Sequence, residues 1–131
     1  MDANIKLVQD CYAAFGRGDV PFILAQCAED VDWQSSDAPE IPYHGKFRGR
    51  DGVMKFFQGI AGALEVKAFE PKTYTASGDE VFAIGSWTCV ARNTGRQFTT
   101  RWLMHFVVKK GKLTYFRPYE DTAIVAAALR K

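Results

Sequence analysis

The stretch DGVMKFFQGIAGAL, from Asp51 to Leu64, marks the point at which the character of the sequence changes. Its large apolar residues recur at positions i, i+3, i+4, i+7 and i+11, namely Val53, Phe56, Phe57, Ile60 and Leu64. This spacing places them in one stripe and predicts an amphipathic helix. Asp51 is suited to cap the start of this helix, and Gly59 and Gly62 weaken its later turns.

Two helices and one strand are predicted before this stretch. Residues 5–15 carry apolar side chains on one face at helical spacing. Asp19 can cap a second helix that runs to about Ala28. Residues 31–35 then alternate like a half-buried strand, and a loop rich in Pro and Gly follows over 36–49. The expected inward side chains of the strand are Val31, Trp33 and Ser35.

Four strands are predicted after the helix, near residues 65–75, 80–91, 97–108 and 113–119. The segments between them, SGD, NTG and KKG, have the chemistry of hairpin turns. Residues 122–129 are rich in Ala, Ile and Val and predict a short terminal helix, with Asp121 at its N-cap. Helices segregated from an antiparallel sheet make an α+β fold, and a strongly bent sheet around the N-terminal helices would enclose a pocket.

The composition limits the classes of protein. The chain has 131 residues, of which 47% are apolar, so one folded domain over residues 1–131 is expected. The net charge is +2, and no Lys/Arg block exceeds two residues, which argues against a nucleic-acid partner. Three cysteines without paired spacing favour a reducing compartment, and no apolar run suggests a membrane partner, so a cytoplasmic protein is expected. Neither the cysteines nor the two distant histidines have metal-ligand spacing, and no cofactor is predicted.

Three segments carry a resemblance to a known family: YAAFGRGDVPFILAQCAEDVDW (12–33), PYHGKFRGRDGVMKFF (42–57) and GKLTYFRPYEDTAIVAAAL (111–129). With them the chain resembles the SnoaL-like branch of the nuclear transport factor 2-like superfamily, which includes ketosteroid isomerase-like proteins. The resemblance implies a cone-shaped α+β fold with a deep apolar pocket, commonly in a homodimer. It also implies a cofactor-free activity of the kind found in the family's isomerases, cyclases, epoxide hydrolases and dehydratases. These enzymes use an acid/base group in the pocket whose pKa is shifted by burial.

The resemblance does not carry over the known catalytic groups. The general-base Asp of the isomerase falls on Ser35, its oxyanion-hole Tyr falls on Cys11 beside Tyr12, and its protonated Asp falls on Met104. The carboxylate of limonene epoxide hydrolase falls on Pro118, where many relatives carry an acid. A Ser cannot act as a carboxylate base and a Met cannot donate a hydrogen bond. Neither of these two activities is therefore expected.

His44, Tyr119 and Asp121 remain as candidate catalytic residues. His44 lies in a loop that can approach the open end of the cone, and His suits proton transfer near neutral pH, although an exposed loop His is the alternative. Tyr119 either contacts a ligand at the pocket mouth or packs against the terminal helix. Asp121, if it caps that helix, is a poor general acid. Glu120 has the opposite parity and is expected in solvent unless a bulge turns it toward the pocket mouth.

The expected pocket has an aromatic and thioether lining that suits a small, flat, apolar or aromatic ligand. The residues assigned to it are Tyr12, Phe15, Trp33, Ser35, Tyr43, Trp102, Met104, Phe116 and Pro118. His105 alternates to the convex face, where a second copy of the chain could pack. The leading hypothesis is a cofactor-free enzyme of the proton-transfer type, such as an isomerase, cyclase or dehydratase, acting on a small apolar ring compound. The alternatives are a non-catalytic binding protein that lost the family's acids, and a structural dimerisation module.

Overall fold

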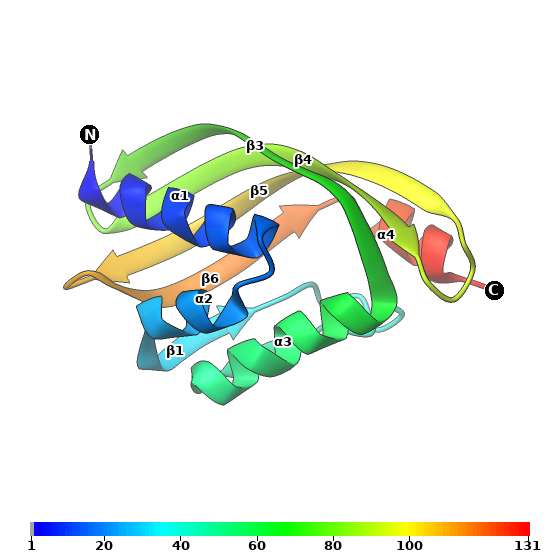
Figure 1. Cartoon of the computed structure of the whole chain (residues 1–131), viewed down its shortest axis with the longest axis horizontal. Coiled ribbons are helices and arrows are strands. Elements are labelled where there is room, and N and C mark those ends of the chain that lie inside the picture. Colours follow the sequence, from blue (N-terminus) through cyan, green and yellow to red (C-terminus); the bar gives the residue numbers. More distant parts are fainter. Residues whose placement is uncertain (1) are drawn as a thin grey trace.

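Helices dominate the first half of the chain and strands dominate the second (Figure 1). The computed structural model describes residues 2–131. The first half contains α1 (Ala3–Gly16), α2 (Val20–Gln26), β1 (Cys27–Gln34), β2 (Lys46–Arg48) and α3 (Gly49–Ala63). The second half contains β3 (Leu64–Ser77), β4 (Glu80–Ala91), β5 (Gln97–Lys109), β6 (Lys112–Glu120) and α4 (Thr122–Leu129). None of the helices within residues 2–131 is long and apolar enough to cross a membrane.

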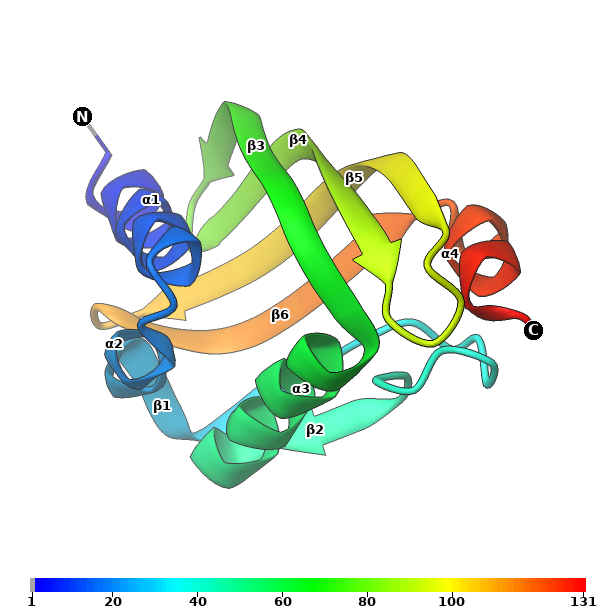
Figure 2. The same ribbon diagram turned by 45° about the vertical axis from the view of Figure 1, so that its right-hand side comes forward.

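The six strands form one curved sheet that does not close on itself, in the order β2-β1-β6-β5-β4-β3. Figure 2 shows this sheet curling around α1, α2 and α3, while α4 lies apart, beside the turn between β4 and β5. The predicted α+β cone is therefore confirmed. One pairing differs from the predicted antiparallel sheet, because β1 and β6 run parallel. A helix and four strands separate these two strands along the chain, and such a long crossover allows parallel pairing.

The sharp bend of the sheet has a local cause where β3 lies against β4. The register of this pair shifts between Pro71 and Thr73, and such a bulge bends a strand. Gly85 pairs with Pro71 at this point. A Cβ atom on Gly85 would lie 2.4 Å from the backbone oxygen of Glu70 and 2.6 Å from Cζ2 of Trp102. The absence of a side chain at Gly85 thus lets the Trp102 indole lie against β4.

Two of the predicted helix caps are confirmed. Asp19 Oδ1 accepts a hydrogen bond from the backbone N–H of Phe22 at 3.1 Å and begins α2. Asp121 Oδ1 accepts one from Ala123 at 3.2 Å and begins α4. A carboxylate in this position satisfies a backbone donor that has no partner within the helix.

The start of α3 differs from its prediction. The helix begins at Gly49, and Arg48 occupies the N-cap without a side-chain hydrogen bond, so the assignment of Asp51 as the cap is wrong. Asp51 lies instead in the first turn, where a carboxylate still favours the positive end of the helix dipole. The preceding residues form β2, which lies within the predicted loop and pairs with β1.

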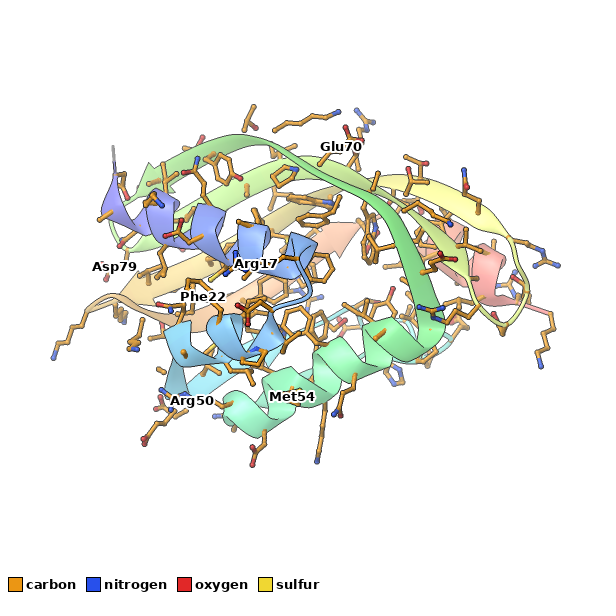
Figure 3. The ribbon with its side chains drawn as sticks, viewed as in Figure 1. Arg17, Phe22, Arg50, Met54, Glu70 and Asp79 are labelled. Atoms are coloured by element: carbon orange, nitrogen blue, oxygen red, sulfur yellow. The ribbon has the colours of Figure 1, made fainter. Side chains whose placement is uncertain are left out.

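Arginine side chains attach the helices to their neighbours (Figure 3). The guanidinium group of Arg17, at the end of α1, lies 5.3 Å from the centre of the Phe22 ring in α2. Arg50, in the first turn of α3, donates from Nε and Nη2 to the backbone oxygen of Cys27 at 3.1 and 2.9 Å. These contacts fix the helices over the concave face of the sheet.

The C-terminal end of α4 is bound by the turn between β4 and β5. Side chains of this turn donate to the last carbonyl groups of the helix, which have no partner within it. The bonds join Asn93 Nδ2 to Leu129 O (2.8 Å), Thr94 Oγ1 to Ala128 O (2.6 Å) and Arg96 Nη1 to Ala127 O (3.0 Å). We refer to this set of bonds as the α4–turn contact.

Candidate functional site

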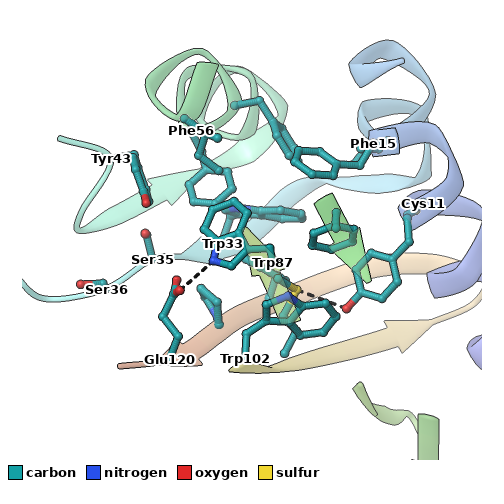
Figure 4. Close-up of a pocket in the computed structure, with 18 of the residues that line it drawn as sticks. Cys11, Phe15, Trp33, Ser35, Ser36, Tyr43, Phe56, Trp87, Trp102 and Glu120 are labelled. Atoms are coloured by element: carbon teal, nitrogen blue, oxygen red, sulfur yellow. Dashed lines mark hydrogen bonds between the residues drawn. The ribbon is translucent and has the colours of Figure 1, made fainter. Parts of the chain in front are cut away.

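A cavity of about 80 Å³ lies between the concave face of the sheet and the helices α1 and α3 (Figure 4). Its lining includes every side chain that the sequence assigned to the pocket. Five further aromatic side chains complete the lining, namely Phe56 and Phe57 of α3, Phe69 of β3, Trp87 of β4 and Phe106 of β5. The rings come from helices and strands alike, so the fold as a whole, and not one motif, forms this lining.

Stacked aromatic rings form the walls of the cavity. Trp33 of β1 stacks on Phe116 of β6 with ring centres 4.1 Å apart, and Phe69 stacks on Trp102 at 5.1 Å. Tyr12 of α1 meets Trp102 at 5.5 Å. Flat apolar walls of this kind suit a flat apolar ligand, because aromatic rings prefer stacked or edge-to-face neighbours.

Glu120, the last residue of β6, places a carboxyl group in this aromatic lining. Side chains alternate between the two faces of a strand, so Glu120 shares the concave face with Phe116 and Pro118. It pairs with Trp102 across β5 and β6. The prediction that Glu120 lies in solvent is therefore wrong. Regular alternation from Phe116 through Pro118 places Glu120 on the cavity side of β6 without a bulge.

Two side chains hold the Glu120 carboxyl group in place. Trp87 Nε1 donates to Glu120 Oε1 at 2.9 Å, and Thr100 Oγ1 donates to the same oxygen at 2.5 Å. The Trp87 N–H also reaches Thr100 Oγ1 at 3.0 Å. Trp87 and Thr100 pair across β4 and β5, so three adjacent strands build the group. The second oxygen, Glu120 Oε2, accepts no hydrogen bond from residues 2–131. It is not fully enclosed either, so a proton donor can reach it.

Burial raises the pKa of Glu120 above its usual value. The hydrogen bonds from Thr100 and Trp87 stabilise the charged form and oppose this rise, and the neighbouring charge of Asp121 adds to it. A carboxyl group with a raised pKa can both take and return a proton closer to neutral pH than an exposed one. Glu120 therefore has the environment of an acid/base group.

Two hydroxyl groups lie at the same end of the cavity as Glu120. Figure 4 shows Tyr43 and Ser35 on this side, with their hydroxyl oxygens directed toward each other. Burial, followed by the nearby charge of Glu120, raises the pKa of Tyr43, so its hydroxyl group stays protonated and can donate. The loop that carries Tyr43 is closed by a hydrogen bond from Ser35 N to Gly45 O at 2.8 Å. Gly59 of α3 leaves room for this loop, since a Cβ atom there would lie 3.0 Å from Tyr43 Cβ.

None of the three candidate catalytic residues predicted from the sequence is in the cavity lining. His44 is exposed, and its Nδ1 lies 2.6 Å from the backbone oxygen of Ile41. Tyr119 is 49% exposed on the opposite face of β6, where the Arg117 guanidinium group covers its ring at 5.2 Å. Asp121 is exposed and caps α4. Their positions follow from loop exposure, strand parity and helix capping, and Glu120 is the acid that the cavity contains.

The thiol groups of the protein are protonated at neutral pH. Cys11 lines the cavity, and burial raises its pKa to about 12. Burial also raises the pKa of Cys27 to about 11 and that of Cys89 to about 12. Among residues 2–131, no three His, Cys, Asp or Glu side chains are grouped so that they could hold a metal ion.

The fold and the site together define a small α+β domain with a curved sheet around an aromatic cavity that contains a buried carboxyl group. Residues 8–116 match the SnoaL-like domain family. The chain therefore belongs to this family, which confirms the resemblance inferred from its sequence. A search of functionally curated proteins returned no match.

Solved structures of similar proteins share the fold over the whole chain. An NTF2-like protein of unknown function from Burkholderia pseudomallei is 27% identical, with 100% of both chains covered and a TM-score of 0.93. An NTF2-like protein from Burkholderia xenovorans is 32% identical over 98% of this chain and 96% of its own, with a TM-score of 0.87. TerC, co-crystallized with polyporic acid, is 21% identical over 99% of this chain and 100% of its own, with a TM-score of 0.86. At that identity the likeness to TerC shows a common fold alone.

Proposed function

We propose that this protein is a cofactor-free enzyme that moves a proton between carbon atoms of a small, largely apolar ring compound. The observation that carries the proposal is the Glu120 carboxyl group, which is buried at one end of an aromatic cavity and has one oxygen bonded and the other open. Membership of the SnoaL-like family supports the same class of reaction.

Glu120 acts as the general base in this proposal. In its ionised form Oε2 takes a proton from the carbon atom between a ring carbonyl group and a ring C=C bond. The electron pair of the broken C–H bond forms a new C=C bond, and the carbonyl π electrons move to its oxygen to give a conjugated enolate. Tyr43 donates a hydrogen bond to the enolate oxygen, where negative charge develops. Glu120 then returns the proton to a different carbon atom, so the reaction is an isomerisation with no net loss of atoms.

Trp87 and Thr100 are positioning residues in this scheme. Both donate to Oε1, which holds that oxygen in place and leaves Oε2 without a hydrogen bond from residues 2–131. Their hydrogen bonds also limit how far burial raises the pKa of Glu120. The carboxyl group therefore keeps an accessible charged form, which a base requires.

The size of the cavity favours a ligand with one ring. An apolar cavity of about 150 Å³ is sufficient for benzene. The cavity here is about 80 Å³, so even one ring must displace side chains or extend through the opening. A polycyclic ligand would need a much larger opening of the aromatic walls.

The conversion of cyclohex-3-enone to the conjugated cyclohex-2-enone tests the proposal, because it needs one proton transfer and can be followed by ultraviolet absorbance. We expect the purified protein to accelerate it and Glu120→Gln to lower kcat/KM by at least about 100-fold. Glu29→Gln, which changes an exposed carboxylate, is the matched control and should keep the rate. A Gln variant at Glu120 that folds and retains full turnover would overturn the role of Glu120.

The same assay tests whether His44, the loop residue that the sequence suggests as a catalytic group, takes part in the reaction. Turnover that survives in His44→Ala removes this residue from the mechanism. Binding of the enone without turnover in the wild-type protein would favour the alternative of a non-catalytic binding protein. Calorimetric titration alongside the rate assay separates the two cases.

We also propose that two copies of the chain pair through the convex face of the sheet. Ile84 of β4 is 49% exposed on this face and lies beside Leu103 of β5. Light scattering after size-exclusion chromatography should give twice the chain mass of 14.7 kDa, and Ile84→Arg should halve it. A monomeric wild-type protein would remove this part of the proposal.

A further inference from the structure

The chain between β1 and β2 closes the end of the cavity that Glu120 occupies. We refer to this segment, residues 35–45, as the end loop. The cavity lining includes four of its side chains, namely Ser35, Ser36, Ile41 and Tyr43. Figure 4 shows Ser35, Ser36 and Tyr43 at the same end of the cavity as Glu120. After burial, the charge of Glu120 is the next cause of the raised pKa of Tyr43, so these two side chains lie near each other.

Strand pairing does not hold the start of the end loop on β6. The parallel pairing of β1 with β6 ends at Trp33 and Phe116. Beyond it, the Ser35 N–H donates across the loop to Gly45 O at 2.8 Å. The backbone oxygen of Ser35 accepts a hydrogen bond from Arg117 Nη1 at 3.2 Å. A side chain of β6 therefore replaces the backbone pairing at the point where β1 leaves β6.

The Arg117 guanidinium group has three acceptors in and beside the end loop. In addition to the Ser35 oxygen, Nη1 donates to Gln34 Oε1 at 3.1 Å, and Nη2 donates to Asp37 Oδ2 at 3.3 Å. The guanidinium carbon lies 5.2 Å from the centre of the Tyr119 ring, which packs against it on the convex face. The Arg117 side chain is only 21% exposed, so water competes little for these bonds. The planar group can hold several acceptors at fixed angles, which the ammonium group of a lysine cannot do.

We propose that Arg117 is a positioning residue of the candidate site. From the convex face of the sheet it holds the end loop in the place where this loop encloses Glu120 on the concave face. Arg117 itself does not line the cavity. Both residues belong to β6, and side chains alternate between the faces of a strand, so one strand carries the acid and the support of its enclosure. This inference rests on the proposed role of Glu120 and concerns how its environment is maintained.

The pKa of Glu120 reports on the enclosure by the end loop. Burial is the largest cause of the raised pKa. The other causes are the hydrogen bonds from Thr100 and Trp87 and the charge of Asp121, so Arg117 acts on this pKa only through the end loop. Loss of a nearby positive charge would raise the pKa of a carboxyl group, whereas loss of its enclosure would lower it. The direction of the change therefore separates support of the loop from a direct effect of charge.

The variant Arg117→Met tests the inference without any substrate. Methionine keeps an unbranched apolar side chain but donates no hydrogen bond. We expect backbone hydrogen exchange in the end loop, followed by NMR, to become about tenfold faster, since a hydrogen bond to a charged group has an effect of this order. The amides to follow are those hydrogen-bonded within the loop, at Ser35, Ile41, His44 and Gly45. In the same variant the pKa of Glu120, from a carbon-13 NMR titration of its carboxyl group, should fall toward the value of an exposed carboxyl group.

Three further variants make the test specific. Arg101→Met is the matched control, because Arg101 is an exposed arginine of β5 on the same face as Arg117, and it should change neither measurement. Asp37→Asn should have a small effect, since the Asp37 side chain is 83% exposed and such ion pairs contribute little. Arg117→Lys keeps the charge but not the planar group, so it should show the effects of Arg117→Met at smaller size.

Unchanged exchange in the end loop of Arg117→Met, or a Glu120 pKa that stays the same or rises, would overturn the inference. If Arg117→Met does not fold, Arg117→Lys decides the point, and wild-type exchange with a wild-type Glu120 pKa in that variant would reject the role of Arg117. Both measurements can be made even if the protein does not convert cyclohex-3-enone, so the two proposals fail separately. Where the wild-type protein does convert it, Arg117→Met should lower kcat more than it changes KM. Turnover that requires Glu120 but is the same in Arg117→Met would retain the enzyme and remove Arg117 from the site.

Discussion

The cavity and the α4–turn contact differ in how completely their hydrogen-bonding groups are paired. In the α4–turn contact, Asn93, Thr94 and Arg96 each donate to a backbone oxygen that the end of the helix would otherwise leave unpaired. Among the cavity-lining residues, Trp33, Tyr43 and Trp102 have enclosed donors that find no acceptor within residues 2–131. The difference shows that the chain can pair its polar groups across distant segments, so the unpaired donors in the cavity are a local feature of the site.

The largest expected effect comes from the wall of the cavity. Gly85→Ala would place a Cβ atom 2.4 Å from the Glu70 backbone oxygen and 2.6 Å from the Trp102 ring, so backbone and ring must move. We expect a loss of about 3 kcal/mol in the free energy of unfolding, measured by urea denaturation. Gly62→Ala is the matched control, because nothing lies within 4 Å of its Cβ position and Ala favours a helix. The same loss in both variants would show that the close approach at Gly85 is unimportant.

A second variant compares the two regions directly. Thr94→Val keeps the shape of the side chain but removes the bond to Ala128 O and the bond from Arg96 N. We expect it to lower the free energy of unfolding by about 1.5 kcal/mol. Tyr43→Phe also removes one hydroxyl group but should produce no loss. Equal losses of unfolding free energy in Thr94→Val and Tyr43→Phe would show that the hydroxyl groups of the two regions contribute equally to stability.

The pH dependence of the free energy of unfolding tests whether the pKa of Glu120 is raised in the folded protein. Because burial raises its pKa in the folded protein, the unfolded chain releases this proton at a lower pH, and the folded state holds more protons between the two pKa values. Ionisation of Glu120 therefore destabilises the fold as pH rises through this interval. Glu120→Gln, which does not titrate and can still accept from Trp87 and Thr100, should gain stability relative to wild type as the pH rises through this interval. Thermal denaturation of both proteins across this range is the measurement, and a constant difference would contradict the raised pKa.

The smallest effect is expected where the two regions meet, at Asp121. Asp121→Ala removes the N-cap of α4 and should lower the free energy of unfolding by about 1 kcal/mol. Asp121→Asn, which can still accept from Ala123 N, should preserve most of the stability. Chemical denaturation of the pair decides the point, and an Ala variant as stable as wild type would show that the cap is dispensable.

Local patterns were sufficient to predict most of the elements. The stripe from Val53 to Ile60 predicted α3, and the alternation of Val31, Trp33 and Ser35 predicted three buried side chains. The three residues of β2 carry too short a pattern to be read from the sequence, and the parallel pairing of β1 with β6 joins segments with no local connection. Contacts between distant segments therefore account for what the sequence did not show.

The site was predicted in its apolar part and missed in its polar part. Strict alternation places Glu120 on the same face as Phe116 and Pro118, whereas the general preference of Glu for solvent predicts the opposite. The partners that make its burial tolerable, Trp87 and Thr100, are 33 and 20 residues away in the chain. A buried acid is recognised only when such partners are known, and they come from the assembled sheet.

The protonated state of Cys11 bears on whether the cavity would tolerate the product of the proposed reaction. Conjugated ring ketones alkylate thiolates, and Cys11 is part of the cavity in which such a product would form. Burial raises the pKa of Cys11 to about 12, so the side chain is a thiol and not a thiolate at pH 7. Because the thiolate is the nucleophile, the same burial that makes Glu120 a better proton carrier leaves Cys11 inert. The cavity can therefore hold an electrophile without being inactivated by it.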